Sequence, residues 1–258
     1  MVFRQSKRSP CKHARRGRGV LGLAALLALV VAGAAAAQFG FFGGGMRLPA
    51  NPDYDGRFTF TRLRYVPNGA WSHDYPRADQ HLVRILAEIT LIKTNTDAGN
   101  VLRLDDPGLF KYPIAYMSEP GFWRMSDAEA LNLRQFLLKG GFIIFDDFEG
   151  RQWNNLEEQM RRVLPESRWV QIDVPHPLFG SFFEMKTVNF PHPMYNLPPH
   201  YYVIFEDNDP NKRVVAIANH DNDVAEYWEW SDRGLFPIDF SNEAYKLGVN
   251  YIIYGLTH

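Results

Sequence analysis

The sequence predicts an α/β protein, a three-layer sandwich built on one mostly parallel sheet. Short apolar runs at residues 112–118 (YPIAYMS) and 141–148 (GFIIFDDF) are typical of strands buried on both faces. Helical patterns lie between such runs, and this alternation favours parallel strands joined by right-handed crossovers. With 258 residues, 46% of them hydrophobic and 22% charged, the chain is long enough for one large domain.

The first 37 residues have the pattern of an export signal. They contain seven Lys or Arg and no acid, and residues 20–37 are uncharged, apolar and end in small residues. We therefore expect a signal peptide cut before Gln38 and a periplasmic or otherwise exported protein. The alternative is an uncleaved inner-membrane anchor, because the apolar run is just long enough to span a bilayer. In that case the protein would contact the membrane only through this segment.

Residues 38–56 are rich in Gly, Pro and aromatic residues and are predicted to form a linker, which leaves residues 57–258 as the folded domain. Strands are expected at residues 58–65, 112–118, 141–148, 169–174, 201–207 and 212–220. Helices are expected after Pro76, from Ser126 to the glycines at 140–141, at 155–164 and at 241–256. Ser126 and Glu129 have capping-box spacing, and Ser241 is a candidate cap of the last helix.

Charge and cysteine content exclude several kinds of function. Without the first 37 residues the chain has 21 basic against 29 acidic residues, a net charge of −8, which disfavours nucleic acid as a partner. The single cysteine, Cys11, lies in the basic segment before the apolar run. The exported part is therefore expected to lack disulfides, cysteine-ligated metals and a thiol nucleophile.

Candidate site residues lie just after the predicted strands, because ligands of open parallel sheets bind beyond the carboxyl ends of the strands. This rule selects Ser118, Glu119, Gly121, Asp146, Asp147, Glu149, His176, His220, Asp221 and Asp223, together with Trp71, His73 and Asp74 after the first strand. Of these, we expect Trp71, Asp74, Glu119, Asp146, Asp147 and His176 to line the binding crevice.

The adjacent carboxylates Asp146 and Asp147 are the most informative pair. Two neighbouring carboxylates repel each other, so at least one should gain a metal ion, a cationic partner, a helix amino terminus or a proton. A divalent metal with His176 or His220 as nitrogen ligand would permit metal-assisted hydrolysis. The structural alternative is that one carboxylate caps the following helix or pairs with an arginine such as Arg151.

Four segments in one order carry a resemblance to a known family: WSHDYPRAD, LFKYPIAYM, LRQFLLKGGFIIFDDFEG and HPLF. They resemble the bacterial family catalogued as domain of unknown function 4159, over roughly Phe58 to His258. The resemblance implies a fold similar to class I glutamine amidotransferase-like α/β sandwiches. Catalytic amidotransferases carry a cysteine after a central strand, where this chain has Asp146 and Asp147, so cysteine-dependent glutamine hydrolysis is excluded.

These observations predict an exported cell-envelope domain that binds a small molecule, a glycan or an envelope protein. The alternative is a metal- or carboxylate-dependent hydrolase in which Asp146 or Asp147 is the metal ligand or general base and His176 assists. No cofactor is expected, although a divalent metal would fit the second interpretation.

Overall fold

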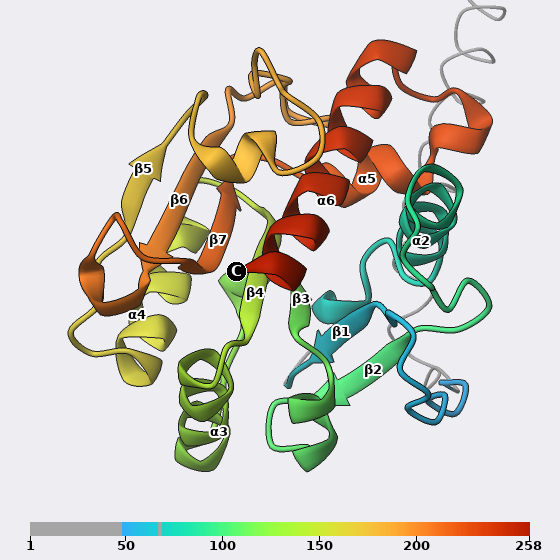
Figure 1. Ribbon diagram of the computed structural model, residues 1–258. Helices are drawn as coiled ribbons and strands as arrows, with labels where there is room; N and C mark the ends of the chain where they lie inside the picture. The colour runs from blue at the N-terminus through green and yellow to red at the C-terminus, as the bar shows by residue number, and fades with distance from the viewer. Residues whose placement is uncertain (1–47, 67–68) are drawn as a thin grey trace, which may run out of the picture. The chain divides into compact units, whose positions relative to one another are not determined.

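The computed structural model describes residues 48–66 and 69–258, and residues 48–258 form one compact unit. The predicted export signal and residues 38–47 of the predicted linker lie outside the described residues. The described part is an α/β fold with a seven-stranded sheet in the order β2-β1-β3-β4-β7-β6-β5 (Figure 1). The strands are β1 (Thr61–Arg64), β2 (Asn100–Arg103), β3 (Ile114–Ser118), β4 (Phe142–Phe148), β5 (Val170–Ile172), β6 (His200–Phe205) and β7 (Val214–His220). The helices are α2 (Arg77–Ile89), α3 (Asp127–Leu138), α4 (Trp153–Val163), α5 (Val224–Glu229) and α6 (Ile238–Thr257).

The sheet is mostly parallel, as predicted. Neighbouring strands among β2, β1, β3, β4 and β7 run parallel, whereas β6 is antiparallel to β7 and β5 is antiparallel to β6. The link between β6 and β7, residues 206–213, is shorter than the dozen or so residues that a parallel crossover needs, so these strands form a hairpin. As a result, the first residue of β6 lies at the same edge of the sheet as the last residue of β7.

Each face of the sheet contributes to a separate hydrophobic core, because successive strand side chains point to opposite faces. Ile114 and Phe142 belong to a core that also contains residues of α2, α5 and α6. Their neighbours Ala115 and Ile143 belong to a second core with α3 and α4. Both faces of the central strands are therefore buried, which explains why their sequences are continuously apolar.

Three of the predicted helices are confirmed with small differences at their ends. α2 buries Ala78, Leu82 and Leu86 on the expected face, and α4 begins two residues before its predicted start. α3 has the predicted capping box: the Ser126 hydroxyl accepts from the Glu129 amide at 3.2 Å, and the Glu129 carboxylate accepts from the Ser126 amide at 2.8 Å. Gly140, at φ 105°, adopts a conformation that suits the end of this helix.

Two elements were not predicted, and one helix cap is wrong. The four residues of β2 and the six residues of α5 are too short to produce a clear periodic signal. The last helix, α6, begins three residues before its predicted start, with Pro237 at the N-cap. Ser241 is therefore a buried residue inside the helix and does not cap it.

The capping box gives a test of the fold. Ser126→Ala removes the side-chain acceptor of the Glu129 amide and should lower the free energy of unfolding by about 1 kcal/mol. Urea unfolding followed by circular dichroism measures this change. Ser126→Thr keeps a hydroxyl at the cap and serves as the control, so an equal loss in both variants would contradict the capping role.

Candidate functional site

The carboxyl edge of the parallel strands concentrates acidic residues with unusual backbone conformations. Asp74, Glu119, Asp147 and Asp221, which follow or end β1, β3, β4 and β7, have φ angles of 62°, 53°, 60° and 57°. The left-handed region is unfavourable for residues other than glycine, and such residues cluster at functional sites. Four acids in this conformation along one edge mark it as the candidate site.

A β-bulge in β4 separates the roles of the two adjacent aspartates. The pairing of β4 with β7 shifts register between Phe145 and Phe148, and Asp146 and Asp147 lie within this interval. A bulge bends the strand and redirects its side chains, and bulges are frequent beside active sites. Here the two carboxylates have different partners.

Asp146 is held entirely by the protein. It is 0% exposed, and its Oδ2 accepts from the Tyr116 hydroxyl at 2.9 Å and from the Ala225 amide at 3.0 Å. Its Oδ1 accepts from the Asn219 amide group at 2.9 Å and from the Val224 amide at 3.2 Å. Burial raises the pKa of Asp146 to about 6, although the bonds from Asn219 and Tyr116 oppose this shift. Asp146 therefore binds the first two amides of α5, whose N-cap is Asp223, and does not cap the helix that follows β4; it is a positioning residue.

Asp147 contributes to a cluster with His73 and Glu119. His73 Nδ1 lies 3.1 Å from a Glu119 oxygen and 3.4 Å from Asp147 Oδ2, which also accepts from the Ser118 hydroxyl at 3.1 Å. The Asp147 and Glu119 side chains are 11% and 12% exposed, whereas that of His73 is 44% exposed. The imidazole thus forms the solvent side of a largely buried pair of carboxylates.

The titration behaviour of this cluster follows from its geometry. Hydrogen bonds to Asp147 and Glu119 raise the pKa of His73 to about 11, so the ring is an imidazolium at neutral pH. Burial raises the pKa of Glu119 to about 7, with a further contribution from Asp147, and His73 opposes the shift. Glu119 can therefore exchange a proton near neutral pH, which is a requirement for general acid–base catalysis.

A second acidic group lies between the β1–α2 loop and α5. Ligand-type atoms of Asp74, Asp223 and Glu226 lie within 4.8 Å of one another. Burial, followed by the charge of Asp147, raises the pKa of both Asp74 and Asp223 well above the usual range. Asp74 Oδ2 is buried and has no hydrogen-bond partner. The same is true of Glu119 Oε2 in the neighbouring cluster.

A buried ion pair positions the loop that carries His73 and Asp74. Arg62 of β1 is 0% exposed, and its guanidinium bonds Asp79 of α2 at 2.5 Å. The same guanidinium donates to the backbone oxygens of Trp71 and His73, at 3.0 and 2.8 Å. Asp79 is the ion-pair partner of Arg62, and the charge of this arginine also acts on Asp74, where it opposes the effect of burial on the pKa.

The segment from Pro191 to Leu197 supplies an unsatisfied donor to this region. His192 is 3% exposed, and its Nδ1 accepts from the Met194 amide at 3.1 Å. Its Nε2 therefore carries the proton, but this atom has no hydrogen-bond partner. Burial lowers the pKa of His192, whereas the charges of Asp147 and Asp221 act in the opposite direction, so the ring lies within the field of the site.

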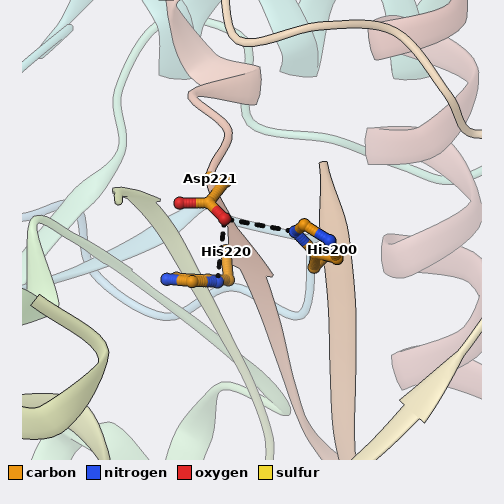
Figure 2. A group of neighbouring side chains, drawn as sticks. All are labelled: His200, His220 and Asp221. Carbon is orange, nitrogen blue, oxygen red and sulfur yellow. Dashed lines mark hydrogen bonds and ion pairs between the residues drawn. The ribbon is translucent and has the colours of Figure 1, made fainter. Parts of the chain in front are cut away.

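Farther along the same edge, two histidines flank the carboxylate of Asp221 (Figure 2). Asp221 Oδ2 lies 3.1 Å from His200 Nδ1 and 3.3 Å from His220 Nδ1. Like the clusters around His73 and Asp74, this group offers three ligand-type atoms within 4.8 Å of one another. It differs from both in having two imidazoles and one carboxylate, the donor set that suits zinc and related ions.

The structure brings together some of the predicted site residues and separates others. Asp74, Glu119 and Asp147 belong to the two acidic clusters, and Trp71 contributes its backbone oxygen to Arg62. His176 caps a short 3-10 helix, accepting from the Leu178 amide at 3.2 Å.

The His176 ring packs on Phe205, the last residue of β6. Phe205 pairs with Val214, the first residue of β7. His176 therefore lies at the opposite end of the strand from His220, and the structure does not bring it together with Asp147. Arg151, the predicted alternative partner of the aspartates, makes no ion pair with either aspartate among the described residues.

Several residues of the edge were missed by reasoning from the sequence. Glu226 lies on the unpredicted helix α5, and His200 begins a strand instead of following one. Recognising β6 and β7 as a hairpin could have indicated His200, because pairing the two strands antiparallel makes this residue the register partner of His220.

The chain belongs to the family described as Domain of unknown function (DUF4159), which it matches over residues 59–256. A comparison with curated proteins finds no match. Within residues 48–66 and 69–258, no helix combines the length and apolar character needed to cross a membrane.

Replacing Asp74 by asparagine tests whether the buried carboxyl groups lower the free energy of unfolding. Asp74→Asn keeps a side chain that tolerates the left-handed conformation and removes a carboxyl group whose ionisation is disfavoured by burial. We expect the free energy of unfolding at neutral pH to rise by roughly 1 kcal/mol in urea titrations.

Asp79→Asn is the matched control, because it makes the same chemical change beside the same arginine. It leaves Arg62 buried without its partner and should lower the free energy of unfolding by about 3–5 kcal/mol. If both variants were destabilised equally, the carboxylate of Asp74 would be a structural group, contrary to our interpretation.

The cluster around His73 also predicts a pH dependence. Folding raises the pKa of Glu119 from 4.5 to about 7 and that of His73 from 6.5 to about 11. The folded state then binds these protons more tightly, so their contribution to stability is full below the unfolded pKa and is lost as pH rises through the folded pKa. In Glu119→Gln, the decrease in the free energy of unfolding between pH 4.5 and about 7 should be smaller than in the wild type.

Denaturant titrations across this pH range measure the difference. Glu88→Gln, an exposed substitution on α2, is the control and should keep the wild-type pH profile. Identical profiles for the wild type and Glu119→Gln would show that burial does not perturb Glu119.

Proposed function

We propose that this protein is an exported cell-envelope module that binds a small polar ligand with a cationic amine at the acidic edge of its sheet. The export signal predicted at residues 1–37 supports the compartment. The observation that carries the ligand class is the convergence of two acidic clusters whose charges are only partly compensated. A ligand cation would relieve the repulsion that the fold imposes on these carboxylates.

The charge balance of the edge supports a cationic group. The clusters contain Asp74, Glu119, Asp147, Asp223 and Glu226, and His73 is the only basic residue among their members. Arg62 lies close by and its charge acts on Asp74, but its ion pair is with Asp79. A cationic amine has donors for the two buried oxygens that lack partners, on Asp74 and Glu119.

The ligand also needs a hydrogen-bond acceptor. His192 Nε2 is a buried donor without a partner, and Asp147 lies near enough for its charge to act on this ring. A hydroxyl oxygen would satisfy this donor, whereas a purely cationic metal ion would not. An amino sugar combines a cationic amine with hydroxyl oxygens and therefore fits both requirements.

Cysteine-dependent glutamine hydrolysis does not fit this chain. Its only cysteine is Cys11, and the carboxyl end of the central strand β4 has Asp146 and Asp147. Two hydrophobic cores, one on each face of the sheet, support a three-layer sandwich similar to class I glutamine amidotransferase-like domains. We infer that such a fold would here serve binding through carboxylates.

A hydrolase is the second candidate function, and one observation favours it. The pKa of Glu119, at about 7, would allow this residue to act as a general acid or base beside Asp147 and His73. In this hydrolase hypothesis, Glu119, Asp147 and His73 take the roles that the sequence predicted for the aspartates and His176. Asp146 already accepts four hydrogen bonds, and His176 lies at the opposite end of the strands.

Binding of glucosamine and N-acetylglucosamine tests the proposed ligand class, because acetylation removes the cationic charge. We expect glucosamine to raise the thermal unfolding temperature of the purified protein and N-acetylglucosamine to have a much smaller effect. Isothermal titration calorimetry then gives the two dissociation constants. Glu119→Gln and Asp147→Asn should each weaken glucosamine binding by at least about 10-fold, the effect of losing one charged hydrogen bond.

Glu88→Gln on the exposed face of α2 is the control and should bind glucosamine as the wild type does. Equal affinities for the two sugars, or unchanged affinity in both site variants, would contradict a cationic-ligand site. Release of product from an amino-sugar conjugate by the wild type but not by Glu119→Gln would instead support the hydrolase.

A further inference from the structure

A group of metal-binding character lies beside the proposed ligand site and shares none of its residues. His200 begins β6, His220 ends β7, and the two are direct partners in the antiparallel register. Asp221 follows at once, and Figure 2 shows its carboxylate between the two imidazole rings. The hairpin thus places two imidazoles and one carboxylate at the carboxyl edge of the sheet.

The hydrogen bonds of His220 leave an uncompensated lone pair. Its Nε2 lies 3.1 Å from the backbone oxygen of Gly150, and only a protonated nitrogen can bond a carbonyl oxygen. In a neutral imidazole the other nitrogen, Nδ1, is then an acceptor, and it lies 3.3 Å from the Asp221 carboxylate. Two acceptors at this distance repel each other unless a cation or a second proton lies between them.

The carboxylate cannot readily turn away from this contact. Asp221 Oδ1 accepts from the Gly150 amide at 2.8 Å, which directs Oδ2 toward both histidines. Gly150 therefore fixes the orientation of two groups, the His220 ring through its oxygen and the Asp221 carboxylate through its amide. Backbone groups that orient ligating imidazoles in this way are typical of the surroundings of protein-bound metal ions.

The distances between the ligand-type atoms fit a single ion. Asp221 Oδ2 lies 3.1 Å from His200 Nδ1 and 3.3 Å from His220 Nδ1. Ligand atoms about 2.0–2.1 Å from a tetrahedral zinc ion lie roughly 3.4 Å apart, so these two distances match a zinc site, and the ligand-type atoms of the two histidines lie within 4.8 Å of each other. The His200 side chain is 37% exposed, so a fourth position would be open to water or a ligand.

We propose that His200, His220 and Asp221 form a binding site for a divalent transition metal ion, with zinc as the best fit. The donor set of two imidazole nitrogens and one carboxylate oxygen favours zinc over calcium or magnesium, which prefer oxygen ligands. The open position would let the ion bind a water molecule or an anionic group beside the acidic clusters. This site goes beyond the proposed amine-binding function and does not depend on it.

Titration of the purified, metal-free protein with Zn²⁺ and Co²⁺ tests the site. We expect one ion per chain by calorimetry, and visible absorption bands of four- or five-coordinate Co²⁺ that Zn²⁺ displaces. His200→Ala and Asp221→Asn should each weaken Zn²⁺ binding by about 100-fold or more, because each removes a direct ligand and even indirect partners contribute about 10–100-fold.

Two controls make the result specific. His258→Ala removes an exposed histidine at the end of the chain, and Glu88→Gln removes an exposed carboxylate on α2; both should bind Zn²⁺ as the wild type does. Loss of Zn²⁺ binding in Glu119→Gln but not in His200→Ala would overturn the proposal, as would wild-type protein that binds neither ion. Because glucosamine binding is measured separately, failure of either proposal is distinguishable from failure of the other.

A measurement on the wild type avoids dependence on the folding of the variants. X-ray absorption of the zinc-loaded protein should show two imidazole ligands in the first coordination shell. A spectrum with oxygen ligands alone would place the ion elsewhere and overturn the assignment.

Discussion

The arrangement of the acidic edge depends on the buried carboxylate of Asp146. Its two oxygens accept four hydrogen bonds, from Tyr116 of β3, Asn219 of β7 and the first two amides of α5. A buried carboxylate without partners would be very costly, so these donors must all be in place in the folded state. Asp146 thereby joins neighbouring strands to α5, the helix that presents Glu226 to the second acidic cluster. One of the two adjacent aspartates that the sequence selected as candidate site residues thus fixes the frame around the site.

This frame holds several groups in unfavourable states. Asp74, Glu119 and Asp147 have left-handed backbones, and burial raises the pKa of Asp74 and of Glu119. The same protein balances Arg62 with Asp79 a short distance away, so its interior does provide counterions where only stability is needed. Left-handed backbones and neighbouring carboxyl groups gathered at one edge are expected of a site shaped for a ligand.

The sequence predicted those parts of the fold that have local signals. The buried strands β3 and β4 and the capping box at Ser126 depend on short-range patterns, and the structure has all three. The rule that ligands lie after parallel strands found Asp74, Glu119 and Asp147, but it also selected His176, which follows an antiparallel edge strand. It missed His200 for the same reason, because the start of an antiparallel strand lies where parallel neighbours end. Strand direction is a tertiary property, and the apolar pattern of one strand does not contain it.

The proposed amine and metal sites are connected through a short piece of backbone. Asp147 belongs to the cluster with His73, while Gly150, three residues later, orients both His220 and Asp221. Between them, Glu149 has a pKa raised by burial and then by the charges of Asp147 and Asp221, so it lies within the field of both groups. A cation bound at either site would reduce the negative potential at Glu149. Occupancy of one site should therefore alter the affinity of the other, and linkage requires the coupling to be reciprocal.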